Sequence, residues 1–304
     1  MSFASEVKAE LCHVKRSRKC CAVAECYGVM LYCNSFTPRE IRIITGSPEF
    51  IELLPKLFRK AFNVSFDVLP ENVKPGGRAT LLMTDPEKIA TVFRAFGMEP
   101  SDTLTLHINL GVLENDCCKT SFVRGAFLAG GSITDPAKRY HLELTTTHAA
   151  VGREMCALLL ELGFEPGLAM RGANHVAYFK QSEAIADFLT MAGAGVPAME
   201  VMSARVEKDM RNEINRKVNC DSANADKIVA AAAEQLEAIR RIEREQGLDT
   251  LPEGLQQAAL LRIANPEASL AELAALSVPS VTKSCLSHRL KRLAAIAKDG
   301  RTGD

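Results

Sequence analysis

The clearest feature of the hydrophobic pattern is an apolar helix predicted at Phe122–Ile133 (FVRGAFLAGGSI), with Gly125 inside it and a glycine pair near its end. Its residues leave almost no polar face apart from Arg124, which predicts a helix buried on most sides. Glycine inside a helix costs roughly 1 kcal/mol relative to alanine, so Gly125 indicates a close backbone contact. The same pattern occurs earlier in the chain, in Cys26–Ser35, where Gly28 takes the place of Gly125. We therefore expect two helices that meet glycine to glycine at the centre of a domain with approximate two-fold symmetry.

The elements around these two helices are predicted to follow in the same order twice. The first helix, from about Cys20 to Asn34, is followed by the strand Arg39–Thr45, the helix Pro48–Phe62, the strands Val64–Leu69 and Ala79–Met83 with a turn at Pro75–Gly77, and a helix that opens at Asp85–Pro86. The second is followed by the strand Tyr140–Thr146, the helix Ala149–Leu162, a hairpin of Phe164–Met170 and His175–Phe179, and the helix Ser182–Met191. This order predicts an internal duplication, with repeats at about 20–100 and 117–192. We expect them to form one α+β domain over residues 1–197, with a short helix at Ser5–Leu11.

The remainder of the chain is predicted to be helical. The Gly193–Pro197 segment marks the end of the α+β domain. We expect residues 198–246 to form a helical linker, broken at Asn219–Ser222 because these residues favour an N-cap. An all-α domain is expected over residues 247–304.

The pattern of residues 247–304 has the proportions of a helix-turn-helix. Capping-box spacing at Thr250–Glu253 and at Ser269–Glu272 predicts two helix starts. The short helix Leu270–Leu276 is followed by a tight connection at Ser277–Ser280 and by a longer helix that ends near Ala297.

The last helix has the chemistry of a DNA-reading helix. The sequence has no acidic residue between Glu272 and Asp299, and hydroxyl and basic side chains occupy the early turns, where a major-groove helix contacts base edges. The predicted DNA-binding residues are Ser280, Thr282, Lys283, Ser284, Ser287, His288, Arg289, Lys291 and Arg292, with Arg205, Lys208 and Arg216 as further contacts to the DNA backbone. The alternative is a three-helix protein-binding bundle with a solvated basic face. We favour DNA binding because basic charge and helix-turn-helix spacing coincide.

Composition narrows the setting in which this chemistry operates. The net charge is zero, so any DNA-binding surface must be local. No stretch is long and apolar enough to span a membrane, and the first residues lack the apolar run of a signal peptide. Ten cysteines without such a signal indicate reduced cytosolic thiols. We expect a cytoplasmic protein without a membrane partner.

Both glycine helices resemble LAGLIDADG motifs, the signature of a homing-endonuclease family. Together with DMRNEINRKVNCDSANADK at 209–227 and VTKSCLSHRLKRL at 281–293, they make the whole chain similar to the bacterial WhiA family, which fuses a LAGLIDADG-like domain to a C-terminal helix-turn-helix. The resemblance implies a nucleoid-associated, sequence-specific transcriptional regulator whose partners are double-stranded DNA and a second transcription regulator. It also implies a role in cell division, chromosome segregation and, where the organism sporulates, sporulation.

The comparison with LAGLIDADG enzymes raises the question of DNA cleavage. Cleaving members carry an acidic metal ligand before the terminal glycine of each motif, because Mg²⁺ requires hard oxygen ligands. The corresponding positions here are Cys33 and Gly130, and neither supplies a side-chain oxygen. We therefore expect no catalytic residue, no metal and no cofactor. The rival hypotheses are an endonuclease that uses another acid and a structural nucleoid or division protein.

The saddle-shaped surface implied by the LAGLIDADG resemblance does not depend on metal ligands for its shape. Its strands carry basic positions, namely Arg39, Arg42, Arg78 and Arg139. A single helix-turn-helix buries little DNA surface, so we expect affinity and specificity to require both domains. The alternative is that this domain is a protein-docking module that does not contact DNA.

Two cysteine pairs occupy equivalent places in the repeats. Cys20–Cys21 opens the first glycine helix and Cys117–Cys118 opens the second. Thiols brought together by the internal symmetry are candidates for a Zn²⁺ site or a redox switch. Adjacent cysteines are poor spacing for one tetrahedral site, so we predict small helix-end residues without a metal.

Overall fold

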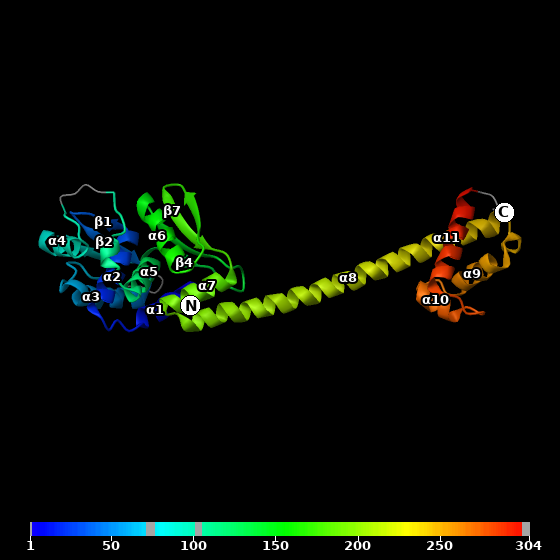
Figure 1. Ribbon diagram of the computed structural model, residues 1–304, viewed down its shortest axis with the longest axis horizontal. Coiled ribbons are helices and arrows are strands. Elements are labelled where there is room, and N and C mark those ends of the chain that lie inside the picture. Colours follow the sequence, from blue (N-terminus) through cyan, green and yellow to red (C-terminus); the bar gives the residue numbers. More distant parts are fainter. Residues whose placement is uncertain (1, 71–76, 101–104, 300–304) are drawn as a thin grey trace. The chain divides into compact units, whose positions relative to one another are not determined.

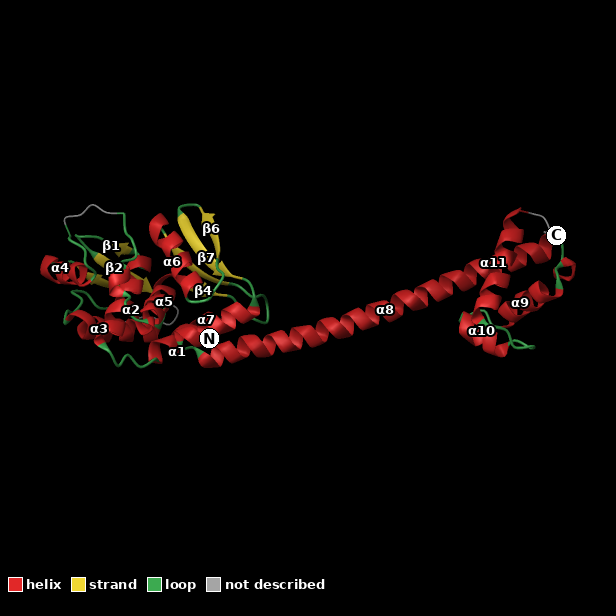
Figure 2. Ribbon diagram, viewed as in Figure 1, coloured by secondary structure: helices red, strands yellow, loops and turns green. Residues whose placement is uncertain are grey.

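The computed structural model describes residues 2–70, 77–100 and 105–299. Residue contacts divide the chain after Lys208 into two compact units, and each is described by itself. Figures 1 and 2 show the helices and strands of both units. The division falls inside a long helix and not at Gly193–Pro197, so the predicted domain boundaries remain a proposal.

Two helices in direct contact form the centre of the first unit. They are α2 (Lys19–Tyr32) and α5 (Asp116–Gly130), which lie side by side in Figure 1. A Cβ on Gly28 would overlap the Phe122 carbonyl oxygen and lie 2.7 Å from the Ala126 amide nitrogen. A Cβ on Gly125 would overlap the Glu25 carbonyl oxygen in return. The predicted close approach at the two glycines is confirmed, and it is reciprocal, since each glycine faces the backbone of the opposite helix.

A buried ionic network joins the same two helices. The fully buried Glu25 carboxylate accepts hydrogen bonds from Arg16 Nη2 at 2.7 Å and from Arg124 Nη1 at 3.2 Å. Arg124 also donates from Nε to the Ala192 carbonyl at 2.6 Å. Removing one partner of a buried ion pair costs about 3–5 kcal/mol, because the other charge stays buried without compensation. The network therefore fixes α2 and α5 to the segment after α1 (Phe3–His13) and to the end of α7 (Ser182–Ala192).

The first half of this unit carries a three-stranded antiparallel sheet in the order β1-β2-β3. Its strands are β1 (Ser35–Phe36), β2 (Ile41–Thr45) and β3 (Ala79–Met83). The core-facing side chains alternate along β2 and β3 and join the core formed with α3 (Pro48–Phe62) and α4 (Pro86–Ala95). The predicted strand Arg39–Thr45 and the predicted helix Pro48–Phe62 are thus confirmed within two residues.

The predicted strand at Val64–Leu69 is wrong as an extended element. Only an isolated bridge between Val68 and Leu82 forms there. The Asp67 carboxylate accepts hydrogen bonds from the backbone amides of Thr84 and Asp85 at 2.6 and 2.8 Å and forms an ion pair with Lys88. These side-chain interactions hold the segment in place of a continuous ladder of backbone hydrogen bonds between strands. Most of the predicted Pro75–Gly77 turn lies outside the described residues.

The second half carries a four-stranded antiparallel sheet in the order β4-β5-β7-β6. Its strands are β4 (Gly131–Ile133), β5 (Leu142–Thr146), β6 (Gly167–Arg171) and β7 (Asn174–Phe179). The helix α6 (Ala149–Glu161) packs on β5, β6 and β7, and α7 packs on α5. Helix, strand, helix, strand and helix thus recur in both halves, with η1 (Leu110–Val112) in the connection between them, and the α+β fold class is confirmed.

The second unit is helical. The helix α8 (Gly195–Glu245) leads into it and is followed by η2 (Leu248–Thr250), α9 (Glu253–Ala264), α10 (Leu270–Leu276) and α11 (Lys283–Asp299). Among the described helices, α8 included, none combines the length and apolar character needed to cross a bilayer.

Two details of the helical prediction are wrong. The chain does not break at Asn219–Ser222, because α8 is continuous through these residues; their N-cap preference is a weak local term among good helix formers such as the following alanines. Thr250 does not cap α9, since its hydroxyl donates to the Gly247 carbonyl at 2.8 Å within η2 and the N-cap is Pro252. The capping box at Ser269–Glu272 is confirmed in full.

We predict that Gly28→Ala destabilises the first unit by about 1–3 kcal/mol or more, because the added methyl meets rigid backbone that cannot rotate away. Urea unfolding with hydrogen exchange of α2 and α5 peptides measures the change. Gly195→Ala is the matched control, since nothing lies within 4 Å of its Cβ. Equal stability of the two variants would contradict the close contact.

Candidate nucleic-acid interface

The helix α11 is positioned by an apolar core beneath it. Leu286, Leu290 and Leu293 are buried against α9 and α10, together with Leu273 of α10. The last turns of α8 contribute Ile239 and Ile242 to this core. One face of α11 is therefore fixed inward, and the opposite face is presented to solvent.

The connection between α10 and α11 is held by two hydroxyls. Ser277 Oγ donates to the Ala274 carbonyl at 2.8 Å and accepts from the Val281 amide at 3.0 Å. Thr282 Oγ1 accepts from the Cys285 amide at 3.2 Å and so caps the first turn of α11. The connection is longer than predicted, because α11 begins at Lys283 and not near Ser280.

Several predicted DNA-binding side chains share the outward face of α11. At about 100° per residue, Ser284, His288 and Lys291 project opposite the buried leucines, Arg292 and Ser287 lie to the two sides of this face, and Lys283 stands in the first turn of the helix. All of these are exposed except Ser287, which is half-buried. Hydroxyls and an imidazole lie in the early turns, and the cations border them or follow. This order suits base contacts near the N-terminus of the helix and phosphate contacts beside them.

Arg289 differs from its neighbours. It is half-buried, and its guanidinium lies against Gly254 of α9, where an added Cβ would be 3.2 Å from Arg289 Cζ. It also lines a cavity of about 220 Å³ with Leu261 and Val278. The sequence shows only another basic residue here, and its packing against α9 is what separates it from the others.

Ser280 is exposed in the connection before α11, and Thr282 is exposed but occupied as a cap. These two residues directly precede α11 in the sequence. We call Lys283, Ser284, Ser287, His288, Lys291 and Arg292 the reading face.

The helix α8 does not present its predicted contacts together. Arg205 pairs with Glu183 of α7, and Lys208 donates to the Pro136 carbonyl at 2.6 Å and lies 4.4 Å from the centre of the Tyr140 ring. These contacts belong to the first unit. Arg216 is exposed farther along α8. Arg205 and Lys208 are thus held by contacts within the first unit, whereas Arg216 belongs to the second.

Cys33 and Gly130, which the sequence comparison sets against acidic metal ligands, lie at the C-terminal ends of the paired helices. The half-buried Cys33 follows α2 as its C-cap, and its thiol donates to the carbonyls of Met30 and Ser35 at 3.2 and 3.3 Å. Burial raises the pKa of the Cys33 thiol to about 12. A Cβ on Gly130 would lie 2.6 Å from the Thr145 carbonyl oxygen and 2.8 Å from Tyr32 Cδ1. Position 130 therefore lacks a carboxylate in the sequence, and the surrounding atoms also leave no space for one.

The outer surfaces of the two sheets carry charges of both signs. Arg42 is exposed on β2 and pairs with Glu40 at 3.3 Å. On β5, Glu143 pairs with Arg171 at 2.7 Å and with His141 at 3.0 Å. Partial burial opposes ionisation of Glu143, but the His141 hydrogen bond and the Arg171 charge hold its pKa below the usual value. Arg39, Arg78 and Arg139 are exposed as well, but they lie in the connections before β2, β3 and β5 and not on the strands as predicted.

The fold and the reading face define a class: a LAGLIDADG-like α+β unit joined to an all-helical helix-turn-helix unit. Family models match both parts, the WhiA LAGLIDADG-like domain over residues 119–211 and the WhiA C-terminal HTH domain over residues 214–297. The chain belongs to the WhiA family.

Relatives and a solved structure support this assignment over the full length. The chain is 36% identical over 306 residues to the probable cell division protein WhiA of Ruminiclostridium cellulolyticum, with 98% of this chain and 97% of the relative covered. It is 35% identical over 314 residues to the protein of the same name from Lachnoclostridium phytofermentans, with 98% of each covered. The crystal structure of full-length DUF199/WhiA from T. maritima matches all of both chains with a TM-score of 0.59 and 27% identity. The family and fold class predicted from the sequence are confirmed.

Proposed function

We propose that this protein is a non-enzymatic, sequence-specific DNA-binding regulator of transcription that acts in cell division. The observation that carries the proposal is the reading face, an exposed strip of hydroxyl, imidazole and cationic side chains on the last helix of a helix-turn-helix. A solvated basic face on a protein-binding bundle would not need hydroxyls concentrated at the helix N-terminus. The names of the relatives support the link to cell division.

The chemistry of the reading face divides into two tasks. Ser284, Ser287 and His288 offer donors and acceptors that can hydrogen-bond base edges in the major groove. Lys291 and Arg292 supply charge for phosphates, which sets affinity without selecting sequence. Arg289 is left out of the interface because it packs against α9.

The saddle formed by the two sheets contributes the remaining affinity in this proposal. A lone helix-turn-helix buries a small DNA surface, and Arg39, Arg42, Arg78 and Arg139 are exposed cations on the first unit. Acidic residues such as Glu143 are already neutralised by basic partners, so they do not repel phosphates strongly.

The wider role in this proposal comes from family membership. Chromosome segregation and, in sporulating organisms, sporulation are included, with a cytoplasmic location at the nucleoid and a second transcription regulator as partner. The rival candidates are a metal-dependent endonuclease and a structural nucleoid protein. The two experiments below separate them.

Removing phosphate-binding cations should change the salt dependence of binding. We expect Lys291→Ala and Arg292→Ala each to flatten the slope of log K against log[salt] by about one, since each neutralised phosphate contributes about 0.9. Fluorescence anisotropy of the full chain on a bound genomic fragment measures the slope.

Two controls test whether this effect is local. Arg289→Ala should keep the slope, although it removes a cation from the same helix, and Lys56→Ala on the exposed side of α3 should also keep it. Unchanged slopes for Lys291→Ala and Arg292→Ala would place the phosphate contacts elsewhere. Salt-insensitive binding would favour a protein-docking bundle.

If the protein were a nuclease, it would cleave DNA in the presence of a divalent metal ion. We predict that the purified full chain with Mg²⁺ or Mn²⁺ leaves duplex DNA intact, because Cys33 and Gly130 supply no carboxylate and Asp135 uses its Oδ1 to accept from the Ala137 amide at 2.8 Å. A plasmid-nicking assay checks this. Divalent-dependent cleavage that disappears in Asp135→Asn or Glu143→Gln would overturn the non-enzymatic proposal.

A further inference from the structure

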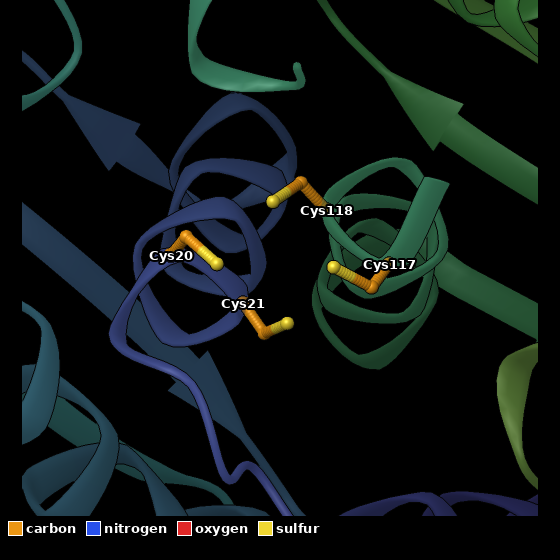
Figure 3. A group of neighbouring side chains, drawn as sticks. All are labelled: Cys20, Cys21, Cys117 and Cys118. Carbon is orange, nitrogen blue, oxygen red and sulfur yellow. The ribbon is translucent and has the colours of Figure 1, made fainter. Parts of the chain in front are cut away.

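Four thiols meet where the paired helices begin. The Sγ atoms of Cys20, Cys21, Cys117 and Cys118 all lie within 4.8 Å of one another. Figure 3 shows the sulfur atoms turned toward the space between the ends of α2 and α5. The internal symmetry thus brings the four thiols together, and the spacing of adjacent cysteines does not prevent them from sharing one site.

The internal symmetry explains why adjacent cysteines converge. Each pair occupies the first turn of one glycine helix, and Gly28 and Gly125 let the backbones of the two helices touch. Across the helix pair, each Sγ of one cysteine pair lies within 4.8 Å of both Sγ atoms of the other pair. Each helix thus supplies two thiols to one cluster.

The dimensions of the cluster suit a small tetrahedral ion. With Zn–S distances of about 2.3 Å, the sulfur atoms of a tetrahedral site lie about 3.8 Å apart. The observed upper limit of 4.8 Å is close enough for side-chain rotation to bring the sulfurs to ligand distance. Cys118 is buried, Cys20 is exposed and the other two are half-buried, so the cluster is sheltered yet reachable from solvent.

The surroundings compensate negative charge. Both helices point their positive N-terminal ends at the sulfurs. Arg18 Nη1 lies 3.9 Å from Cys117 Sγ, and Lys15 lines the same cleft of about 410 Å³ as Arg18, Cys21 and Cys117. A metal bound by four thiolates carries a net charge of −2, which these groups offset.

We propose that Cys20, Cys21, Cys117 and Cys118 bind one Zn²⁺ ion as a structural site that fastens the two halves of the LAGLIDADG-like unit together. Binding converts four thiols to thiolates and releases their protons, with no change of oxidation state. A closed set of four sulfur ligands leaves no position for water, so the site is structural and independent of the DNA-binding proposal.

Cobalt substitution tests this on the full chain. Protein that has been reduced and stripped with a chelator is titrated with Co²⁺ and then with Zn²⁺. We expect one equivalent of Co²⁺ to give thiolate charge-transfer absorption and the intense visible bands of tetrahedral cobalt, and Zn²⁺ to displace it. Zn²⁺ should also raise the unfolding midpoint of the first unit.

Single serine variants identify the ligands. Loss of a supporting residue around a metal ligand already lowers affinity about 10–100-fold, so Cys20→Ser and Cys117→Ser should each lower it more than about 100-fold. Cys220→Ser and Cys285→Ser are matched controls, because both thiols are exposed and outside the cluster, and they should bind like the parent. Circular dichroism checks that every variant is folded.

Three results would overturn the proposal. The first is the absence of stoichiometric tetrahedral cobalt in the reduced protein. The second is binding that persists unchanged in folded Cys20→Ser and Cys117→Ser variants. The third is a disulfide between the helices that forms readily in air, found by mass spectrometry, in a protein that binds no metal when reduced; this would assign the cluster to redox chemistry.

Discussion

The close approach of α2 and α5 at Gly28 and Gly125 is the constraint on which the first unit depends. Because neither residue has a side chain, α2 and α5 approach until backbone touches backbone. That approach places the Glu25 carboxylate where Arg16 and Arg124 can both reach it. It also sets the two ends of the helix pair, with the thiol cluster at the N-terminal end. Any larger residue at either glycine separates the helices and disturbs all of these features together.

The two units solve different problems in a chain without net charge. The first unit buries only a few charged side chains and pairs them with opposite charges, as at Glu25. Its exposed arginines are spread over the strands and turns. The second concentrates cations on one helix by removing acids from the sequence between Glu272 and Asp299. A local field of one sign is what a DNA-binding helix requires, and overall charge does not reveal it. Packing against α9 decides how far a cation of α11 is exposed, as the half-buried Arg289 shows.

The fold was largely predictable from the sequence, because the glycine helices, the alternating strands and the Ser269 capping box are local patterns that tertiary packing reinforces. Two predictions were wrong because a local preference was outweighed. At Asn219–Ser222 the helix continues despite the N-cap preference of these residues. At Val64–Leu69 the hydrogen bonds of Asp67 hold the segment in place of an extended strand. Within the candidate site, the residues of the reading face could be predicted from residue type. The contacts that hold Arg289, Arg205 and Lys208 could not, because their partners are distant in the sequence. The meeting of the cysteine pairs followed from the repeat, whereas the distances between their sulfurs depended on how closely the helices approach.

The central claim is that α11 selects DNA sequence through Ser284 and His288. A genome-wide occupancy map of the full-length protein, compared with that of a Ser284→Ala/His288→Ala variant at equal abundance, tests it most directly. The account predicts discrete sites with a shared sequence for the parent protein. The variant, which keeps Lys291 and Arg292, should lose these sites while retaining dispersed binding. Identical maps for the two proteins would contradict the assignment of base recognition to this face.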